Sequence, residues 1–539
     1  MRVRSLLARV GRTRPSLARR VVSWLDQPVG PLTRVIGWVG STILFLLVAT
    51  ALGGPTEGDS SEVVYGTWAV QHGRLSCVYP VAGPHHPMAL ANPFALAAPL
   101  YPLVSGLVAA VLRIGHAVDF PSSRTLGPSC ANGFAALFRW SVRASAIEPT
   151  VRIGFVMWLA LLAGVLYLVR STERRGTGWE VATGFALAVT PPVVMCLTYY
   201  FHPQDLLAMA LVLAGTGAVL RGRPLTAGVL FGLALTAQQF AILAALAVIV
   251  LIDRRSLGRL FVGAATAVVV VDGPFVALSG LRALKTVLLG SSRVGSAITP
   301  HGGTVVFSLG LTGIPSFVVS RVVPLVVAAA LAAWVRRARG GQALPPAGLV
   351  TVVAAALLAR LVFEVNIFGY YLMAVFVAVL VVEVLRGQLG RDVIALAGLF
   401  LVYFDPEHIA LVSNLTPYGL AVFYDIPIVI GALGVVVFLY DALRRRNVVL
   451  DALWVALVAL TGEDHLWGHY YPIWNLPEWA WQVIVVGYAL VVVARRLAPY
   501  LGRGGELEDE LHAQPLGVPL GLLGDPSGAA TPDAADRPQ

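Results

Sequence analysis

Charged residues are scarce in this sequence of 539 residues. Asp, Glu, Lys and Arg make up 13% of the chain, hydrophobic residues make up 57%, and the mean hydropathy is +0.77. A soluble protein carries about 25% charged and about 45–50% apolar residues. A soluble core cannot hide this much apolar surface, and a disordered chain would be more polar. The composition therefore predicts an all-α polytopic membrane protein.

Several chemical signatures are also missing. The sequence has three cysteines and no C-x-x-C pair, which argues against a zinc site. It has no glycine-rich phosphate loop and no cytosolic domain that could carry one. Its basic residues, of which Lys285 is the only lysine, are scattered between apolar segments rather than clustered. We therefore expect no metal, no cofactor and no nucleic-acid partner.

Clusters of arginine lie between the apolar segments. A helix needs ~20 residues to span a bilayer, and the apolar segments therefore predict about 12–14 transmembrane helices. If the arginine clusters lie on the cytoplasmic side, both termini are cytoplasmic as well. The predicted spans lie near 35–52, 151–169, 180–197, 206–220, 225–237, 238–252, 257–278, 320–335, 346–364, 368–385, 392–403, 419–440, 447–461 and 480–494.

Three regions follow from this pattern. Residues 1–34 form a basic cytoplasmic tail, 35–496 the membrane domain, and 497–539 a Gly/Pro/Ala/Asp-rich cytoplasmic tail that we expect to be disordered. Within the membrane domain, 53–150 form a long first extracytoplasmic loop. The apolar stretch 93–112 contains three prolines, and a crossing there would move later arginines outside. We expect it to lie along the outer interface or to re-enter it.

Two carboxylates follow the first predicted span. Asp59 and Glu62 are three residues apart, so a helix would place both on one face. Close to the membrane edge, partial desolvation could tune either carboxylate to act as a general base. The alternative is structural, because Asp59 or Ser60 could cap a helix that carries Glu62 in its first turn.

Two of the three cysteines, Cys77 and Cys130, fall in this same outer loop. In an oxidising compartment they could form a disulfide that fixes the shape of the loop. The alternative is a pair of unpaired buried thiols. Cys196, at the end of a predicted span, has no candidate partner of its own.

The order of several weak motifs resembles a known enzyme superfamily. Asp59, Tyr65, Gly73 and Tyr79 follow the first span as in GT-C glycosyltransferases, and the segment from Asn92 to Leu103 resembles their interfacial helix. The later motifs resemble glycosyltransferase family 87, of mannosyltransferase-like, actinobacterial type. They are His202-Pro203-Gln204-Asp205, Arg221-Gly222-Arg223, the segment 227–234, Gln238-Gln239-Phe240, Arg360 and Tyr370-Tyr371-Leu372.

The resemblance implies a GT-C-like bundle whose long first outer loop carries interfacial helices, in the plasma membrane of a bacterium. It also implies inverting transfer of a sugar, mannose or arabinose, from a polyprenyl-phosphate donor to a glycolipid or cell-envelope glycan. Asp59 would be the base and Glu62 its alternative or an acceptor-orienting partner. Two positions depart from the family, because Ser61 stands where an acid is usual and Gln238-Gln239 where a lysine is common.

The remaining candidates would bind substrate on the outer side. Arg282, Lys285, Arg293 and His301 could hold the lipid phosphate, or could anchor their loop at the headgroups. His202 and Asp205 could orient substrate, or Asp205 could cap a helix. Arg360 and Glu364, four residues apart, could contact the donor or form a structural ion pair. Tyr65 and Tyr370 complete the predicted set.

Two other functional classes fit the composition. A transporter or flippase of lipid-linked sugars also needs many spans, but it more often has inverted repeats and charges near mid-bilayer. An oligosaccharide ligase or polymerase that uses a lipid pyrophosphate would typically carry its long catalytic loop late in the chain. We expect a membrane enzyme with lipid partners, and the sequence leaves its oligomeric state open.

Overall fold

The computed structural model describes residues 17–52, 59–78, 98–114, 144–198, 201–279, 306, 311–338, 342–365 and 369–387. In these ranges the chain forms helices and no strand, apart from an isolated bridge between Pro28 and Thr177. The elements are α2 (Leu17–Leu25), α3 (Pro31–Leu52), α4 (Asp59–Gln71), η1 (Leu75–Cys77), α5 (Leu100–Ile114), α7 (Ala144–Val169), α8 (Gly178–Ala188), α9 (Pro191–Thr198), α10 (Pro203–Leu220), α11 (Pro224–Ala237), α12 (Ala241–Leu251), α13 (Arg254–Ser279), α16 (Gly313–Phe317), η4 (Val318–Val322), α17 (Val323–Ala338), α18 (Pro346–Phe363), η5 (Gly369–Tyr371) and α19 (Leu372–Arg386).

The predicted all-α polytopic membrane fold is confirmed. Among the described residues, six helices are long and apolar enough to cross a bilayer, or seven if the bent pair α8–α9 counts as one span. Each predicted span from 35–52 to 368–385 coincides with a helix or a helix pair. The predicted spans beyond residue 387, and with them the total of about 12–14, lie outside the described residues.

The predicted span at 180–197 corresponds to a bent pair of helices. The chain bends by 46° between α8 and α9. Pro191 and Pro192 stand at the bend, and proline has no backbone N–H with which to continue a helix. Thr190, just before the bend, is buried, and its hydroxyl donates to the Ala186 carbonyl at 2.7 Å.

Side-chain contacts fix the directions of the first helices. Phe45 of α3 stacks on Trp158 of α7 at 4.4 Å, and Trp38, further back on α3, lies 5.8 Å from the guanidinium of Arg170 at the end of α7. The two helices are therefore antiparallel. Because α3 ends where α7 begins, the chain between them returns to the same end of the bundle without a net crossing.

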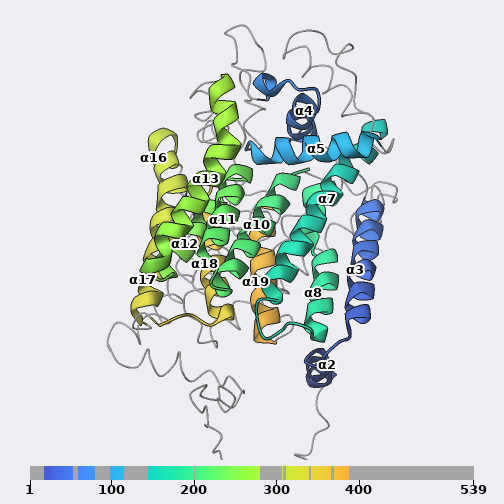
Figure 1. Cartoon of the computed structure of the whole chain (residues 1–539), viewed down its shortest axis with the longest axis vertical. Coiled ribbons are helices and arrows are strands. Elements are labelled where there is room, and N and C mark those ends of the chain that lie inside the picture. Colours follow the sequence, from blue (N-terminus) through green and yellow to red (C-terminus); the bar gives the residue numbers. More distant parts are fainter. Residues whose placement is uncertain are drawn as a thin grey trace, which may run out of the picture. The chain divides into compact units, whose positions relative to one another are not determined.

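Helices α4 and α5 belong to this intervening segment. Figure 1 shows α5 lying across the helix bundle, with α4 packed on it, at the end where α7 begins and α13 ends. The Thr67 and Ser105 hydroxyls lie 2.6 Å apart and join the two helices. We call this the α4–α5 end of the bundle. The prolines of the segment do not break α5, since Pro102 falls in its first turn, where no N–H is needed.

The opposite end of the bundle collects arginines, and we call it the arginine-rich end. Arg174 donates to Asp26 at 2.5 Å, and Arg336 caps the end of α12 through the Val250 carbonyl at 2.7 Å. Glu180, fully buried, is approached by Arg34 and Arg170 at 3.6 and 3.3 Å. The arginines at or next to the helix termini of this end are Arg34, Arg170, Arg174, Arg175, Arg221, Arg223, Arg254, Arg255, Arg336, Arg337 and Arg386.

Glycines set the closest helix packing in the bundle. Helices α11 and α13 run side by side in parallel, with Gly228 of α11 against the backbone of Leu260 and Gly263 of α13 against that of Leu225. A Cβ at Gly228 would collide with the Leu260 carbonyl oxygen. Small residues that let backbones approach are typical of membrane helix pairs.

We predict that Gly228→Ala lowers the free energy of unfolding by about 1–3 kcal/mol, because the added methyl forces the two helices apart. The midpoint of thermal unfolding in detergent measures this. Gly258→Ala on α13 is the matched control, since a Cβ there meets nothing within 4 Å. Equal shifts for the two variants would show that this contact does not hold the helices together.

Candidate functional site

Three of the junctions between described helices lie at the α4–α5 end. There α9 gives way to α10, α11 to α12, and α18 to η5. Each break leaves polar backbone and side chains that lipid cannot solvate, so they must find partners within the protein. The partners they find form two groups that are joined by aromatic rings.

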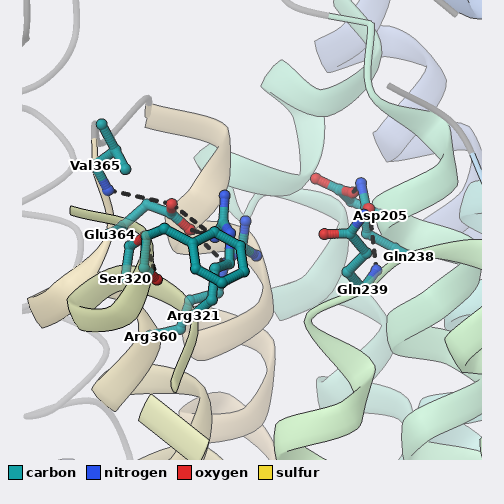
Figure 2. A network of polar contacts seen from close by, with 9 residues as sticks. Asp205, Gln238, Gln239, Ser320, Arg321, Arg360, Glu364 and Val365 are labelled. Atoms are coloured by element: carbon teal, nitrogen blue, oxygen red, sulfur yellow. Dashed lines mark hydrogen bonds and ion pairs between the residues drawn. The ribbon is translucent and has the colours of Figure 1, made fainter. Parts of the chain in front are cut away.

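The first group surrounds Asp205 in the first turn of α10. Asp205 is buried, and its Oδ1 accepts a hydrogen bond from Gln238 Nε2 at 2.7 Å (Figure 2). Gln238 reaches it because α11 ends there and the Gln238 backbone is extended. Gln238 Oε1 in turn accepts from the backbone N–H of Gln239 at 3.1 Å. Gln238, which stands where a lysine is common in the family, thus holds the buried carboxylate of Asp205.

The structure corrects the interpretation of Asp205 as a helix cap. Helix α10 has His202 at the N-cap position, followed by Pro203, and Asp205 lies within the helix. Proline in the first turn removes one of the donors that a cap would satisfy. The Asp205 side chain is therefore available for the contact with Gln238.

His202 connects α10 to the segment before α19. Its ring stacks on Tyr370 with centroids 3.8 Å apart and planes 14° apart, and its Nδ1 accepts from Gln204 Nε2 at 2.9 Å. Tyr370 meets Tyr371 edge to face at 4.6 Å. Two residues that lie far apart in the sequence, His202 and Tyr370, are thus in contact, as a shared site requires.

The second group is centred on Glu364, whose side chain is only 3% exposed. Arg321 Nη1 donates to both carboxylate oxygens at 2.9 and 3.1 Å, and Arg360 Nε donates at 2.9 Å (Figure 2). The backbone N–H of Val365 donates to the same carboxylate at 3.2 Å. These donors, two of them guanidinium groups, offset the cost of burying the carboxylate.

Aromatic rings link the two groups. The Arg360 guanidinium lies 5.5 Å from the centre of the Phe240 ring and 4.8 Å from that of Tyr371. Its charge also acts on Asp205 across this short aromatic bridge.

The predicted Arg360–Glu364 pair is confirmed, but its second arginine was missed. The two residues are not on one continuous helix face, because α18 ends at Phe363 and Glu364 has extended backbone. Arg321 comes from η4, a π-helical turn before α17. The signal for it in the sequence was an arginine within an apolar run, where an unpaired charge would be costly.

Helix α4 carries the predicted catalytic carboxylates at the same end. Asp59 and Glu62 lie in its first two turns, but their side chains lie outside the described residues, so neither the catalytic nor the capping role is tested. Tyr65 is fully buried against Trp68, with ring centroids 5.7 Å apart. Burial raises the pKa of Tyr65, which keeps the phenol neutral.

Several predicted residues remain untested. Cys77 is disulfide-bonded and Cys196 is a buried free thiol. The predicted partner of Cys77 lies outside the described residues, as do all four candidates of the loop 279–319. The residues outside are Cys130, Arg282, Lys285, Arg293 and His301. Among the described residues, no three His, Cys, Asp or Glu side chains could hold a metal ion together. The expectation that the protein needs no metal stays a prediction.

The family model of glycosyltransferase family 87 matches residues 134–363. The match covers less than half of the chain, and over these residues the chain is similar to glycosyltransferase family 87. The matched segment contains His202, Asp205, Gln238, Arg321 and Arg360, and it ends one residue before Glu364. Neither a curated protein nor a solved structure matches the chain. The predicted resemblance to family 87 is confirmed over these residues, and with the apolar helices it supports a membrane-embedded glycosyltransferase. The mannosyltransferase-like, actinobacterial type stays a prediction.

We predict that Glu364→Gln destabilises this glycosyltransferase by about 3–5 kcal/mol, because two largely buried arginines lose their shared carboxylate. The midpoint of thermal unfolding in detergent, compared with that of the wild type, measures this loss.

The control is Glu173→Gln, which removes an exposed carboxylate at the arginine-rich end. It should shift the unfolding midpoint little. If Glu364→Gln shifts the midpoint as little as this control does, the two arginines do not depend on Glu364 for their stability.

Proposed function

We propose that this glycosyltransferase moves a sugar, mannose or arabinose, from a polyprenyl-phosphate donor to a glycolipid or cell-envelope glycan. The transfer inverts the sugar and takes place at the extracytoplasmic face. The observation that carries the proposal is the buried charged network at the α4–α5 end, most of which lies within the family 87 segment. Each chemical requirement of such a transfer has a candidate at that end.

The leaving group requires positive charge. As the glycosidic bond breaks, the lipid phosphate gains negative charge, and preorganised cations stabilise it. Arg321 and Arg360 are both fixed by Glu364, so two guanidinium groups share this one carboxylate. Their rigidity is useful, because an arginine already held in place loses little entropy when it meets a phosphate.

The sugar requires polar groups and a flat apolar surface. The carboxylate of Asp205 is held by Gln238, and the stacked rings of His202 and Tyr370 lie in the same network. A carboxylate accepts hydrogen bonds from sugar hydroxyls, and an aromatic ring packs against the C–H face of a sugar. These residues are our candidates for orienting the donor sugar or the acceptor.

The acceptor hydroxyl requires a base. Asp59 and Glu62 lie at the start of α4, which Tyr65 and Trp68 anchor to the α4–α5 end. We assign Asp59 as the base and Glu62 as the alternative. Because α4 is packed on α5, its first turn is held at the end of the bundle that carries the arginines of the network.

The charge distribution supports the sidedness. Eleven arginines lie at the opposite end from the network. The positive-inside rule places such an end in the cytoplasm. The α4–α5 end would then face outward, with both the network and the carboxylates of α4 on the extracytoplasmic side.

The test is transfer of radiolabelled mannose or arabinose from its polyprenyl phosphate in proteoliposomes. Asp59→Asn should lower kcat by about 10²–10⁴-fold, since that is what a positioned base contributes. Glu62→Gln should lower it less. The control is Asp253→Asn before α13, where asparagine serves a helix terminus as well as aspartate does.

Full activity of both variants would show that neither carboxylate is the base. Movement of the intact lipid-linked sugar across the bilayer without transfer would instead support a transporter or flippase. Transfer of a whole oligosaccharide from a lipid pyrophosphate, with no transfer from the monophosphate, would support a ligase or polymerase.

A further inference from the structure

A cavity of about 1070 Å³ opens at the arginine-rich end, far along α7 from the polar network. Its walls come from α3, from the second half of α7, from the turn after α7 and from Arg221 at the end of α10. Further along the same helices, Phe45 stacks on Trp158 and joins α3 to α7. The cavity therefore lies between α3 and α7, towards their arginine-rich ends.

The deeper wall of this cavity is apolar. Val39 and Ile43 of α3 and Leu159 of α7 line it, with exposed fractions of 53%, 52% and 37%. These three side chains lie on helices long and apolar enough to span a bilayer. In a membrane they would face hydrocarbon, so this wall fits an acyl chain rather than a polar ligand.

The mouth of the cavity is cationic. Of its three arginines, Arg170 is engaged by Glu180 at 3.3 Å. Arg221 donates to Ser171 Oγ at 2.7 Å and lies 4.1 Å from the Tyr167 ring, but it has no carboxylate partner within the described chain. Arg175 is exposed and likewise has no acidic partner there. Two positive charges at the mouth are thus available to an anion.

A hydrogen-bond donor without a partner among the described residues lies between the apolar wall and the cationic mouth of the cavity. Trp38 lines the cavity, and its indole Nε1 is buried without a hydrogen-bond partner among the described residues. A buried N–H without an acceptor is costly and calls for an explanation. A ligand that carries an oxygen acceptor between an acyl chain and an anionic group would satisfy it.

We propose that this cavity binds one anionic phospholipid from the leaflet at the arginine-rich end. The phosphate would lie at Arg175 and Arg221, the ester oxygens would lie near Trp38, and an acyl chain would lie along the apolar wall. The lipid would brace α3 against α7. This site is separate from the network of the proposed transfer reaction and does not depend on that proposal.

The test is native mass spectrometry of the purified full chain with phosphatidylglycerol or phosphatidylcholine added, together with thermal unfolding of the same samples. One phosphatidylglycerol should bind in preference to phosphatidylcholine and raise the unfolding midpoint. Arg221→Gln and Arg175→Gln should each weaken its binding by about fivefold, whereas Arg221→Lys should largely preserve it.

Two further variants distinguish the contribution of the arginine charges to lipid binding from that of the apolar wall. Arg223→Gln is the matched control, because Arg223 is exposed two residues from Arg221 but does not line the cavity. It should leave binding unchanged. Ala163→Phe fills the cavity from α7 without a change of charge, and it should lower the number of bound phospholipids.

Three results would overturn the proposal. The first is equal binding of phosphatidylcholine, which would indicate annular lipid only. The second is an equal loss of binding in Arg221→Gln and Arg223→Gln. The third is displacement of phosphatidylglycerol by polyprenyl phosphate at a one-to-one ratio, which would assign the cavity to the donor lipid. Arg175→Gln keeps the test decisive if Arg221→Gln fails to fold, because the Arg175 side chain is exposed.

Discussion

The inability of lipid to hydrogen-bond the backbone is the constraint on which the rest of this structure depends. A helix can stop inside the bilayer only where the protein itself supplies partners for the freed groups. Here α10 begins, α11 ends and α18 ends beside one another, and the side chains at these stops are Asp205, Gln238 and Glu364. The polar network is a consequence of placing several helix breaks together.

The same constraint explains why the network is rigid. Glu364 is buried, and the cost of burying its charge is offset by the ion pairs with Arg321 and Arg360. The arginines depend on Glu364 in turn, since an unpaired charge there is costly. Mutual dependence of this kind fixes the orientation of all three groups before any substrate arrives, which is what stabilisation of a charged leaving group requires.

The two ends of the bundle differ in what their charges do. At the α4–α5 end a few charges are buried, paired and flanked by aromatic rings. At the arginine-rich end many arginines lie near the surface, and Asp26 and Glu180 tie α2, α3 and α8 together. The first arrangement suits chemistry on a substrate, and the second suits orientation in the membrane and contact with lipid headgroups.

Hydrophobicity and arginine placement in the sequence were enough to predict the membrane fold and the positions of the described helices. Those signals are local, because a helix must hide its own backbone and its loops must carry their own charge. The sequence also predicted the Arg360–Glu364 pair, because its members are only four residues apart. The motif order predicted family 87, as the match over residues 134–363 confirms.

Only the tertiary structure decided which distant residues meet. No local pattern brings Arg321 to Glu364, His202 to Tyr370, or Gln238 to Asp205. Nor does composition reveal the bend at Pro191 or the cavity beside Arg221. The physical reason is that the sequence specifies how each helix hides its own backbone, whereas the pairing of buried charges depends on how helices from distant parts of the chain pack together.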